Sequence, residues 1–144
     1  MVRIRQTFWA QWNDGSKAAR LRTARDFKRL VDAGIQVTLS ADAGFGPTGT
    51  LVGTFFGYAE HVQMENFVRL GMTPAQAIVA STSRPAAALG LSDVVGTMAP
   101  GKSADFLVLD ANPLDDIMNS RKISRVYVRG EQVDRGALRA AWTR

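Results

Sequence analysis

A short apolar run that ends in an aspartate is the part of this sequence best suited to chemistry. Residues 37–39 (Val-Thr-Leu) form the run, Asp42 follows it, and Gly44 comes two residues later. The β-branched and aliphatic side chains predict a buried strand, and α/β proteins keep their reactive groups just beyond the carboxyl ends of strands. A carboxylate there can shuttle a proton or bind a metal ion. An aspartate that only caps a turn fits the same position, so the residues alone leave both interpretations open.

A catalytic metal site needs more ligands than the sequence supplies near Asp42. Catalytic zinc takes about three protein ligands, mostly histidine, whereas the chain has one histidine, His61, and no cysteine. His61 falls in a stretch that predicts a helix, which favours a surface or loop-contacting histidine over a metal ligand. A substrate-proximal role for His61 stays open, because residues 43–57 before it hold five glycines and one proline and predict a flexible loop over a site. Asp42 alone cannot hold a catalytic metal.

The elements that would position Asp42 are a helix and a strand. Ser16 suits the N-cap of a helix that runs to about residue 32, and Gly34 suits its C-terminal end. The predicted buried strand at 35–39 follows at once. Helix, short loop and buried strand make one step of a parallel α/β arrangement. The helix has one apolar stripe at three- and four-residue steps: Leu21, Ala24, Phe27, Leu30 and Val31.

Short, alanine-rich helices are predicted between residues 58 and 90. The first runs from about residue 58 to residue 70 and ends at Gly71. Thr73 suits the N-cap of the next helix, with Pro74 at its first position. A last short helix finishes before Gly90.

After residue 96 the pattern becomes β-rich. Alternation of apolar and polar residues and turn-forming pairs predict strands there. The predicted boundary lies within 91–100 and gives two domains, 1–95 and 96–144. The predicted elements of the tail are a turn at 99–102, strands at 106–109 and 123–128, a helical turn within 114–120, a hairpin turn at 129–130 and a closing helix at 138–142.

Composition and charge describe an ordinary folded protein. The chain has 144 residues, of which 46% are hydrophobic and 22% charged, and no apolar run approaches the roughly 20 residues of a membrane helix. We expect a cytoplasmic protein without a membrane partner. Of the net charge of +5, residues 1–30 contribute +6, from eight basic and two acidic side chains. A basic helix can bind nucleic acid, but these charges alternate with apolar positions, which favours a solvated helix face.

Three local patterns, taken in order, resemble the C-terminal part of the amidohydrolase superfamily, close to its imidazolonepropionase-like and cyclic-amide or dipeptide-hydrolysing branches. Each pattern is modest alone, and their order and spacing over roughly residues 17–134 carry the resemblance. The first runs from Ala33-Gly34-Ile35 through Ser40-Ala41-Asp42-Ala43-Gly44, the second comprises Leu70–Pro74, Ala77, Ala80–Thr82 and Pro85–Leu91, and the third comprises Gly96–Asp110, Asn112–Leu114 and Val128–Gly130.

The resemblance implies an incomplete α/β fold. In that family a (β/α)₈ barrel holds one or two divalent metals, usually zinc, and both chain ends build a small β-sandwich. Residues 16–90 would be the last strand of the TIM-type barrel with its flanking helices, and 96–134 the C-terminal strands of the sandwich. Asp42 would act both as the catalytic acid/base and as a ligand of the metal. The substrate of the complete enzyme would be a small-molecule amide. Lys102 would be a turn residue of the sandwich, not a catalytic lysine.

The family's remaining metal ligands, including a His-x-His pair, have no counterpart in the sequence. Whether this chain is an enzyme is therefore uncertain, and we expect it to hold no metal stably by itself. It can be a fragment, one piece of a split enzyme with a complementary chain, or a non-catalytic interaction module. The fragment is favoured, because a single barrel strand would leave both of its edges unpaired. We expect the isolated chain to expose apolar surface and to aggregate or form homo-oligomers.

Overall fold

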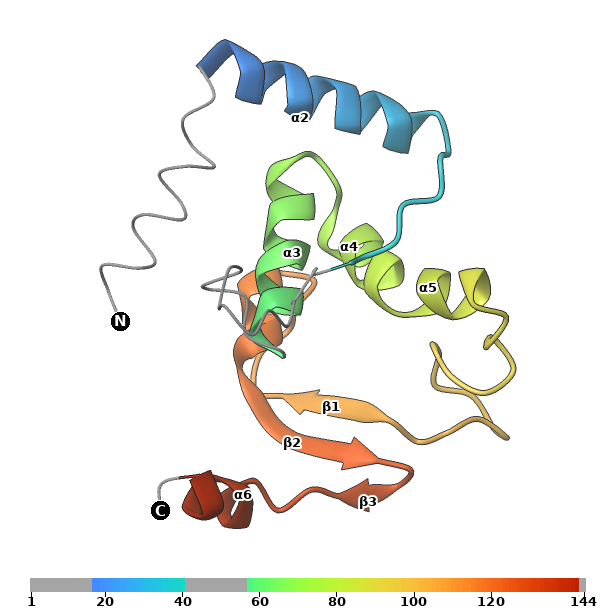
Figure 1. The fold of residues 1–144 in the computed structure, drawn as a ribbon, viewed down its shortest axis with the longest axis vertical. Helices are drawn as coiled ribbons and strands as arrows, with labels where there is room; N and C mark the ends of the chain where they lie inside the picture. The colour runs from blue at the N-terminus through green and yellow to red at the C-terminus, as the bar shows by residue number, and fades with distance from the viewer. Residues whose placement is uncertain (1–16, 41–56, 143–144) are drawn as a thin grey trace, which may run out of the picture. The chain divides into compact units, whose positions relative to one another are not determined.

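The computed structural model describes residues 17–40 and 57–142 (Figure 1). The chain divides into two compact units between Ser81 and Thr82. This boundary separates two packed units. The predicted boundary between barrel and sandwich, at 95/96, is a different division and stays a prediction. The first unit contains α2 (Lys17–Asp32), α3 (Tyr58–Arg69) and α4 (Pro74–Ser81), and the second contains α5 (Ser83–Ala88), β1 (Phe106–Leu109), the 3₁₀ helix η1 (Ile117–Arg121), β2 (Ile123–Val128), β3 (Glu131–Gln132) and α6 (Arg135–Trp142).

Helix α2 contacts α3 through one aromatic pair and one lysine stem. The rings of Phe27 and Phe67 stack with centroids 5.7 Å apart. The aliphatic carbons of Lys28 lie over Gly71, where a β-carbon would come within 3.0 Å of them. The ammonium group of Lys28 pairs with Asp32 at 2.7 Å. Of the other members of the predicted apolar stripe, Leu21 and Leu30 are exposed, at 61% and 51%, whereas Ala24 and Val31 are half-buried.

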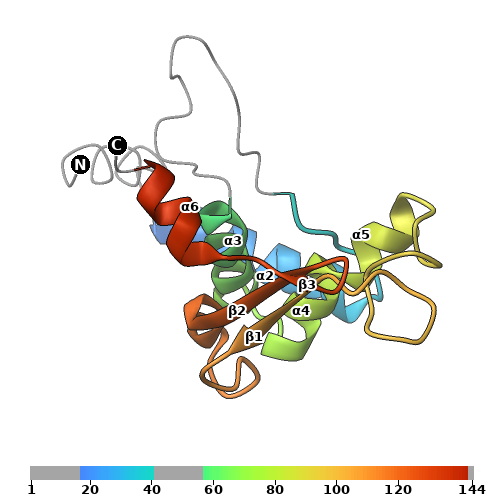
Figure 2. The same ribbon diagram turned by 90° about the horizontal axis from the view of Figure 1, so that it is seen from below.

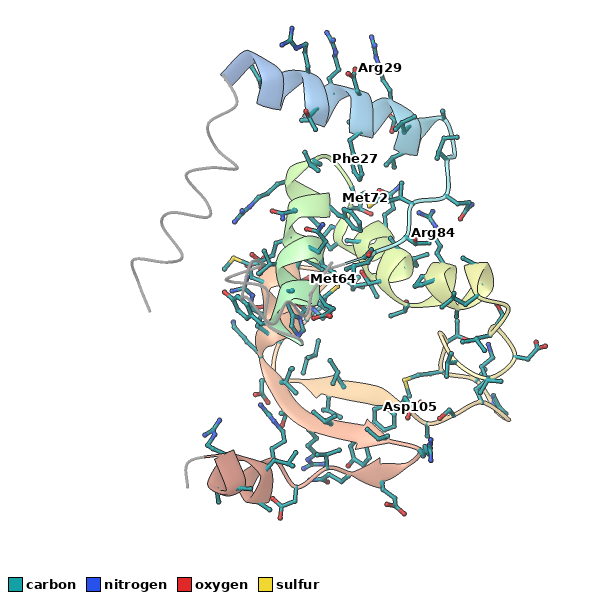
Figure 3. All side chains as sticks on the ribbon, viewed as in Figure 1. Phe27, Arg29, Met64, Met72, Arg84 and Asp105 are labelled. Carbon is teal, nitrogen blue, oxygen red and sulfur yellow. The ribbon has the colours of Figure 1, made fainter. Side chains whose placement is uncertain are left out.

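The basic side chains of α2 behave as a solvated face. Arg29 projects from the side of α2 opposite Phe27 (Figure 3) and is 72% exposed. Arg25 and Arg29 both lie within 4 Å of Asp26, at 3.6 and 3.9 Å. Such exposed pairs stabilise little, but they offset part of the positive charge, as the predicted solvated face requires.

Glycines end the helices where the sequence predicts. After α3, the Gly71 N–H donates to the Val68 carbonyl and the Met72 N–H to the Phe67 carbonyl, which is the Schellman pattern. Gly71 has a φ of 109°, in the left-handed region that favours glycine. The same pair of backbone hydrogen bonds closes α2 at Gly34 and α5 at Gly90. These three predicted helix ends are confirmed.

The start of α4 is a capping box. The Gln76 N–H donates to Thr73 Oγ1 at 3.2 Å, and the Thr73 N–H donates to Gln76 Oε1 at 2.8 Å. Two backbone donors that the helix leaves free are thereby satisfied. The predicted N-cap at Thr73 and first helical position at Pro74 are confirmed.

The prediction of a buried strand at 35–39 is wrong for this chain. Residues 35–40 have no strand partner among the described residues, and Ile35 is 53% exposed. Besides the Ile35 N–H bond to the Leu30 carbonyl at the end of α2, a backbone bond ties the segment to α4, from the Leu39 N–H to the Ala80 carbonyl at 2.8 Å. A strand forms only against a neighbouring strand, so the apolar pattern alone could not produce one here.

The second unit is built on an antiparallel sheet in the order β1-β2-β3 (Figures 1 and 2). Phe106 lies opposite Tyr127, and their rings stack with centroids 4.5 Å apart. The Tyr127 hydroxyl bonds Gln132 Oε1 on β3 at 3.1 Å. The predicted strands at 106–109 and 123–128 are confirmed. The predicted helical turn within 114–120 is the 3₁₀ helix at 117–121, and the closing helix begins at Arg135, where the Asp134 carboxylate caps it through the Ala137 N–H.

Few large apolar side chains are buried in the described residues. The buried apolar side chains of the first unit are mostly small, with Phe67 and Met72 the larger ones (Figure 3). Large apolar side chains remain exposed in both units, such as Leu30 at 51% and Met98 at 79%. The expected exposure of apolar surface is thereby confirmed for these residues. No helix in the described part of the chain is long and apolar enough to cross a membrane.

Candidate functional site

Asp42, the residue predicted to carry catalysis and bind metal, lies outside the described residues. The structure does describe the segment that leads toward it, residues 35–40. Val37 and Leu39 are half-buried, whereas Thr38 and Ser40 are exposed. The bond from Leu39 to Ala80 fixes this segment to the end of α4. The catalytic and metal-binding roles of Asp42 therefore stay predictions.

His61 lies in the first turns of α3 and is half-buried. Its position on a helix agrees with the sequence prediction. Glu65 follows it by four residues, so the two side chains share one helix face. Two such residues are fewer than the three ligands that a catalytic zinc takes from the protein.

The metal implied by the family resemblance does not fit the described residues. Within residues 17–40 and 57–142, no group of three or more histidine, aspartate, glutamate or cysteine side chains is placed to hold a metal ion. Carboxylates are present in both units, but they are dispersed or engaged in turns and caps. No catalytic step can therefore be derived through a metal from this part of the chain.

Glu65 is a buried carboxylate that the sequence reading missed. It is 5% exposed, and Nη2 of the Arg69 guanidinium lies 3.9 Å from its Oε2. Burying a carboxylate is costly unless the charge is paired and hydrogen-bonded. The available signal was its spacing, since Glu65 comes three residues after the apolar Val62 and falls on the same side of the helix.

Two hydrogen bonds hold the carboxylate of Asp105. Its Oδ1 accepts the Arg129 N–H at 2.6 Å, and its Oδ2 accepts the Ser103 hydroxyl at 2.7 Å. The backbone bond first, and the hydroxyl second, hold the pKa of Asp105 below its ordinary value of 3.8. Because it lies at the turn end of the sheet (Figure 3), Asp105 is a structural anchor of that turn.

The turn that Asp105 holds is the predicted hairpin. Arg129 and Gly130 have φ values of 52° and 84°, as the type I′ turn of two-residue hairpins requires. Arg129 is the one non-glycine residue with a positive φ among those described. The prediction of a hairpin at 129–130 is confirmed.

Lys102 lies in the predicted turn at 99–102. The Lys102 N–H donates to the Ala99 carbonyl at 3.2 Å, and Gly101 has a φ of 85°. Lys102 Nζ donates to Thr97 Oγ1 at 2.6 Å. These contacts are those of a turn residue, in agreement with the structural role predicted for it.

Two shallow hollows border β3 in the second unit. One, of about 410 Å³, is lined by Val128, Arg129, Glu131, Gln132 and Val133. The other, of about 430 Å³, extends from Ser124 and Arg125 to the first residues of α6. Two charged groups that line the second hollow are engaged in the fold, since the Asp134 carboxylate accepts the Ala137 N–H and Arg135 Nη1 donates to the Ile123 carbonyl.

Comparison with known proteins identifies the class to which this chain belongs. Residues 16–133 match the sequence profile of the amidohydrolase family, which is most of the 144 residues. The chain is a member of the amidohydrolase family. The family predicted from the three sequence patterns is confirmed.

The chain is similar to individual members of known sequence or structure. The imidazolonepropionase of Geobacillus kaustophilus is 36% identical over 97 residues, which is 66% of this chain and 21% of that protein. The solved structures of molinate hydrolase and of phenylurea hydrolase B are 32% and 34% identical, each with a TM-score of 0.69 over 79% of this chain and 27% of theirs. The chain thus spans about a fifth of the length of the curated relative that it matches.

Proposed function

We propose that this chain is the part of an amidohydrolase that carries Asp42, and that the whole enzyme hydrolyses carbon–nitrogen bonds of cyclic amides or dipeptides. The observation that supports this proposal is the family match across residues 16–133, which contains Asp42. The relatives support the same activity, since they include an imidazolonepropionase and a putative prolidase from Bifidobacterium longum.

Asp42 is proposed as the acid/base of that reaction. Hydrolysis of a carbon–nitrogen bond requires a proton to leave the attacking water and another to reach the departing nitrogen. One carboxylate can do both in turn, accepting the first proton and donating it later. The matched residues include Asp42, and membership in a hydrolase family supports this role over that of a turn residue.

The divalent metal, zinc in the family resemblance, is proposed only for the complete enzyme. Its ligands, Asp42 among them, would come from protein outside residues 17–40 and 57–142, because the described side chains offer no cluster for it. The chain by itself is therefore proposed to be inactive and cytoplasmic, as a fragment of the (β/α)₈ barrel and of the sandwich. Its substrate is proposed to be a small-molecule amide.

A chimera tests this proposal. Residues 16–133 of this chain would replace the corresponding segment of the Geobacillus kaustophilus imidazolonepropionase, and hydrolysis of a cyclic amide and of a dipeptide would be measured. We expect the chimera to be active, the isolated chain to be inactive, and Asp42→Asn to lower kcat by about 10²-fold or more. Asp32→Asn is the matched control, since Asp32 is exposed on α2 and pairs only with Lys28.

Two results would contradict the proposal. Full activity of the Asp42→Asn chimera would remove the acid/base role of Asp42. Hydrolysis by the isolated chain, with wild-type rates and sensitivity to Asp42→Asn, would show that no further part of a barrel is needed.

A further inference from the structure

The segment that leads to Asp42 runs alongside the helices of the first unit. It leaves the end of α2, which contacts Gly71, just beyond the end of α3, through the stem of Lys28. Further along the segment, the Leu39 N–H bonds the Ala80 carbonyl near the end of α4. The segment therefore passes from the end of α3 toward the end of α4.

Helices α3 and α4 pack against each other and are joined by residues 70–73. Helices with a connection this short are antiparallel neighbours, so the end of α4 lies toward the beginning of α3. Asp42 comes two residues after Ser40, the last described residue of the segment, and at most about 7 Å further along the chain. The first turns of α3 are therefore the part of that helix from which a side chain can meet a substrate held at Asp42.

His61 and Glu65 are an imidazole and a carboxylate on this part of α3. They lie one turn apart on one face. Side chains on a helix lean toward its beginning, so the Glu65 carboxylate reaches back over the turn that contains His61. His61 is half-buried and Glu65 is 5% exposed. A hydrogen bond in such a shielded place is stronger than one at the surface.

A histidine is a suitable neighbour for this buried carboxylate. The Arg69 guanidinium, at 3.9 Å from Glu65, is beyond hydrogen-bond distance, and the Arg69 side chain is 65% exposed. Helix α4 has no charged residue. A carboxylate accepts hydrogen bonds at about four positions, and a ring N–H of His61 one turn away can fill one of them. A bond of this kind fixes the ring tautomer and leaves the other ring nitrogen as an acceptor.

We propose that Glu65 orients His61 and that His61 accepts a hydrogen bond from the N–H of the substrate amide, which selects cyclic secondary amides over N-substituted ones. The inference rests on the proposed function for the nature of the substrate. A buried acceptor discriminates in this way because an N-substituted amide has no N–H and leaves the acceptor unpaired. His61 is then the residue that contacts the substrate, and Glu65 is a positioning residue.

Nuclear magnetic resonance of the full chain tests the pairing. His61 is its one histidine, so isotope labelling of histidine gives a single set of ring signals. At a pH well above about 6.5, where an imidazole is neutral, we expect one tautomer in the wild type and a mixture of two in Glu65→Gln. Arg69→Gln is the control, since it removes the guanidinium and should leave the tautomer unchanged, and circular dichroism checks that both variants keep their helices. A mixture in the wild type, or an unchanged ring in Glu65→Gln, would overturn the positioning role.

Substrate discrimination is measured in the chimera described above. The probes are γ-butyrolactam, a cyclic secondary amide, and N-methyl-γ-butyrolactam, with the Kd of each measured by calorimetric titration alongside hydrolysis. We expect about tenfold tighter binding of γ-butyrolactam, from one hydrogen bond to a buried acceptor. His61→Phe keeps a planar ring without the acceptor and should bind both amides equally, and Glu65→Gln should lose part of the preference. Gln63→Ala is the matched control, because Gln63 lies on another side of α3 and bonds Asn66 at 3.0 Å.

Two results would overturn the role of His61. One is the same preference in His61→Phe as in the wild-type chimera. The other is a wild-type chimera that binds both amides with the same Kd, or binds neither. A preference that depends on His61 but is not followed by hydrolysis would support this inference and contradict only the proposed function. Hydrolysis without the preference would do the reverse.

Discussion

The two predicted β regions of this chain behave differently. Residues 106–109 and 123–128 form paired strands, whereas residues 35–40 form no regular secondary structure and have one backbone bond to α4. Both regions have β-branched and aliphatic residues. The difference is the separation along the sequence between a strand and its partner. Only a short stretch of chain in the same unit separates β1 from β2. No strand partner for 35–40 exists in the described residues. Local pairing therefore decides which apolar run becomes a strand.

The largest test of this comparison is Arg125→Pro in the middle strand. Arg125 lies opposite Val108. The Val133 N–H bonds the Val126 carbonyl, so Val126 faces β3 and the alternation along the strand places the backbone of Arg125 toward β1. Proline there removes a ladder bond inside the sheet and should destabilise the second unit by about 3 kcal/mol. The exposed side chain itself contributes little burial. Amide hydrogen exchange over β1 and β2 measures this local unfolding. Unchanged protection of these amides would mean that the hydrogen-bond ladder between β1 and β2 is assigned wrongly.

The second prediction concerns close packing within the same unit. A β-carbon on Gly96 would lie 2.5 Å from the Ala86 β-carbon and 3.1 Å from the Thr82 carbonyl oxygen, and its φ is 91°. Gly96→Ala should therefore destabilise by about 2–4 kcal/mol, from overpacking and the left-handed backbone together. Gly90→Ala is the matched control, since its φ is 69° with nothing within 4 Å, and should cost about 1 kcal/mol. Equal losses in urea unfolding would contradict the packing argument.

The third prediction addresses the weaker region. Leu39→Pro removes the N–H that bonds the Ala80 carbonyl at 2.8 Å. The expected loss is about 1 kcal/mol, the net value of one hydrogen bond, and it should be confined to the first unit. Thr38→Pro is the control, because Thr38 is exposed and should change stability less. A loss comparable with that of Arg125→Pro would show that 35–40 is held as firmly as the sheet.

These contrasts show what sequence patterns could and could not predict. Helix ends at Gly34, Gly71 and Gly90 and the cap at Thr73 are set by neighbours within a few residues, and all were predicted. The hairpin at 129–130 is local as well. The strand at 35–39 depends on long-range pairing, which a residue pattern does not contain.

The candidate site follows the same rule. Asp42 was chosen from its place after an apolar run and from family resemblance, and it stays a prediction. Burial of Glu65 depends on the surroundings of α3 and not on its own residue type, so composition could not reveal it. The role of Asp105 depends on Arg129, which lies 24 residues further on.

The fourth prediction follows the pH dependence of the hairpin anchor. Because the pKa of Asp105 is lowered in the folded chain, its ionised form stabilises the fold at pH values above its ordinary value of 3.8. That contribution is lost as the pH falls through the lowered pKa. Asp105→Asn should therefore be less stable than wild type near pH 6, and the difference should shrink below pH 3.8. Unfolding curves over this range check it, and a difference independent of pH would mean that the charge contributes nothing.

The smallest effect, and the one of opposite sign, is expected at Arg129. A non-glycine residue in the left-handed region costs about 1–2 kcal/mol, and Arg129 has a φ of 52°. Glycine relieves that cost but makes the unfolded chain more flexible, by about 0.4–1 kcal/mol. Arg129→Gly should therefore stabilise the hairpin by about 0.5 kcal/mol, since the backbone N–H that bonds Asp105 is retained. Amide exchange at Val133 measures this, and a destabilised hairpin would show that the arginine side chain, not the turn geometry, holds Asp105.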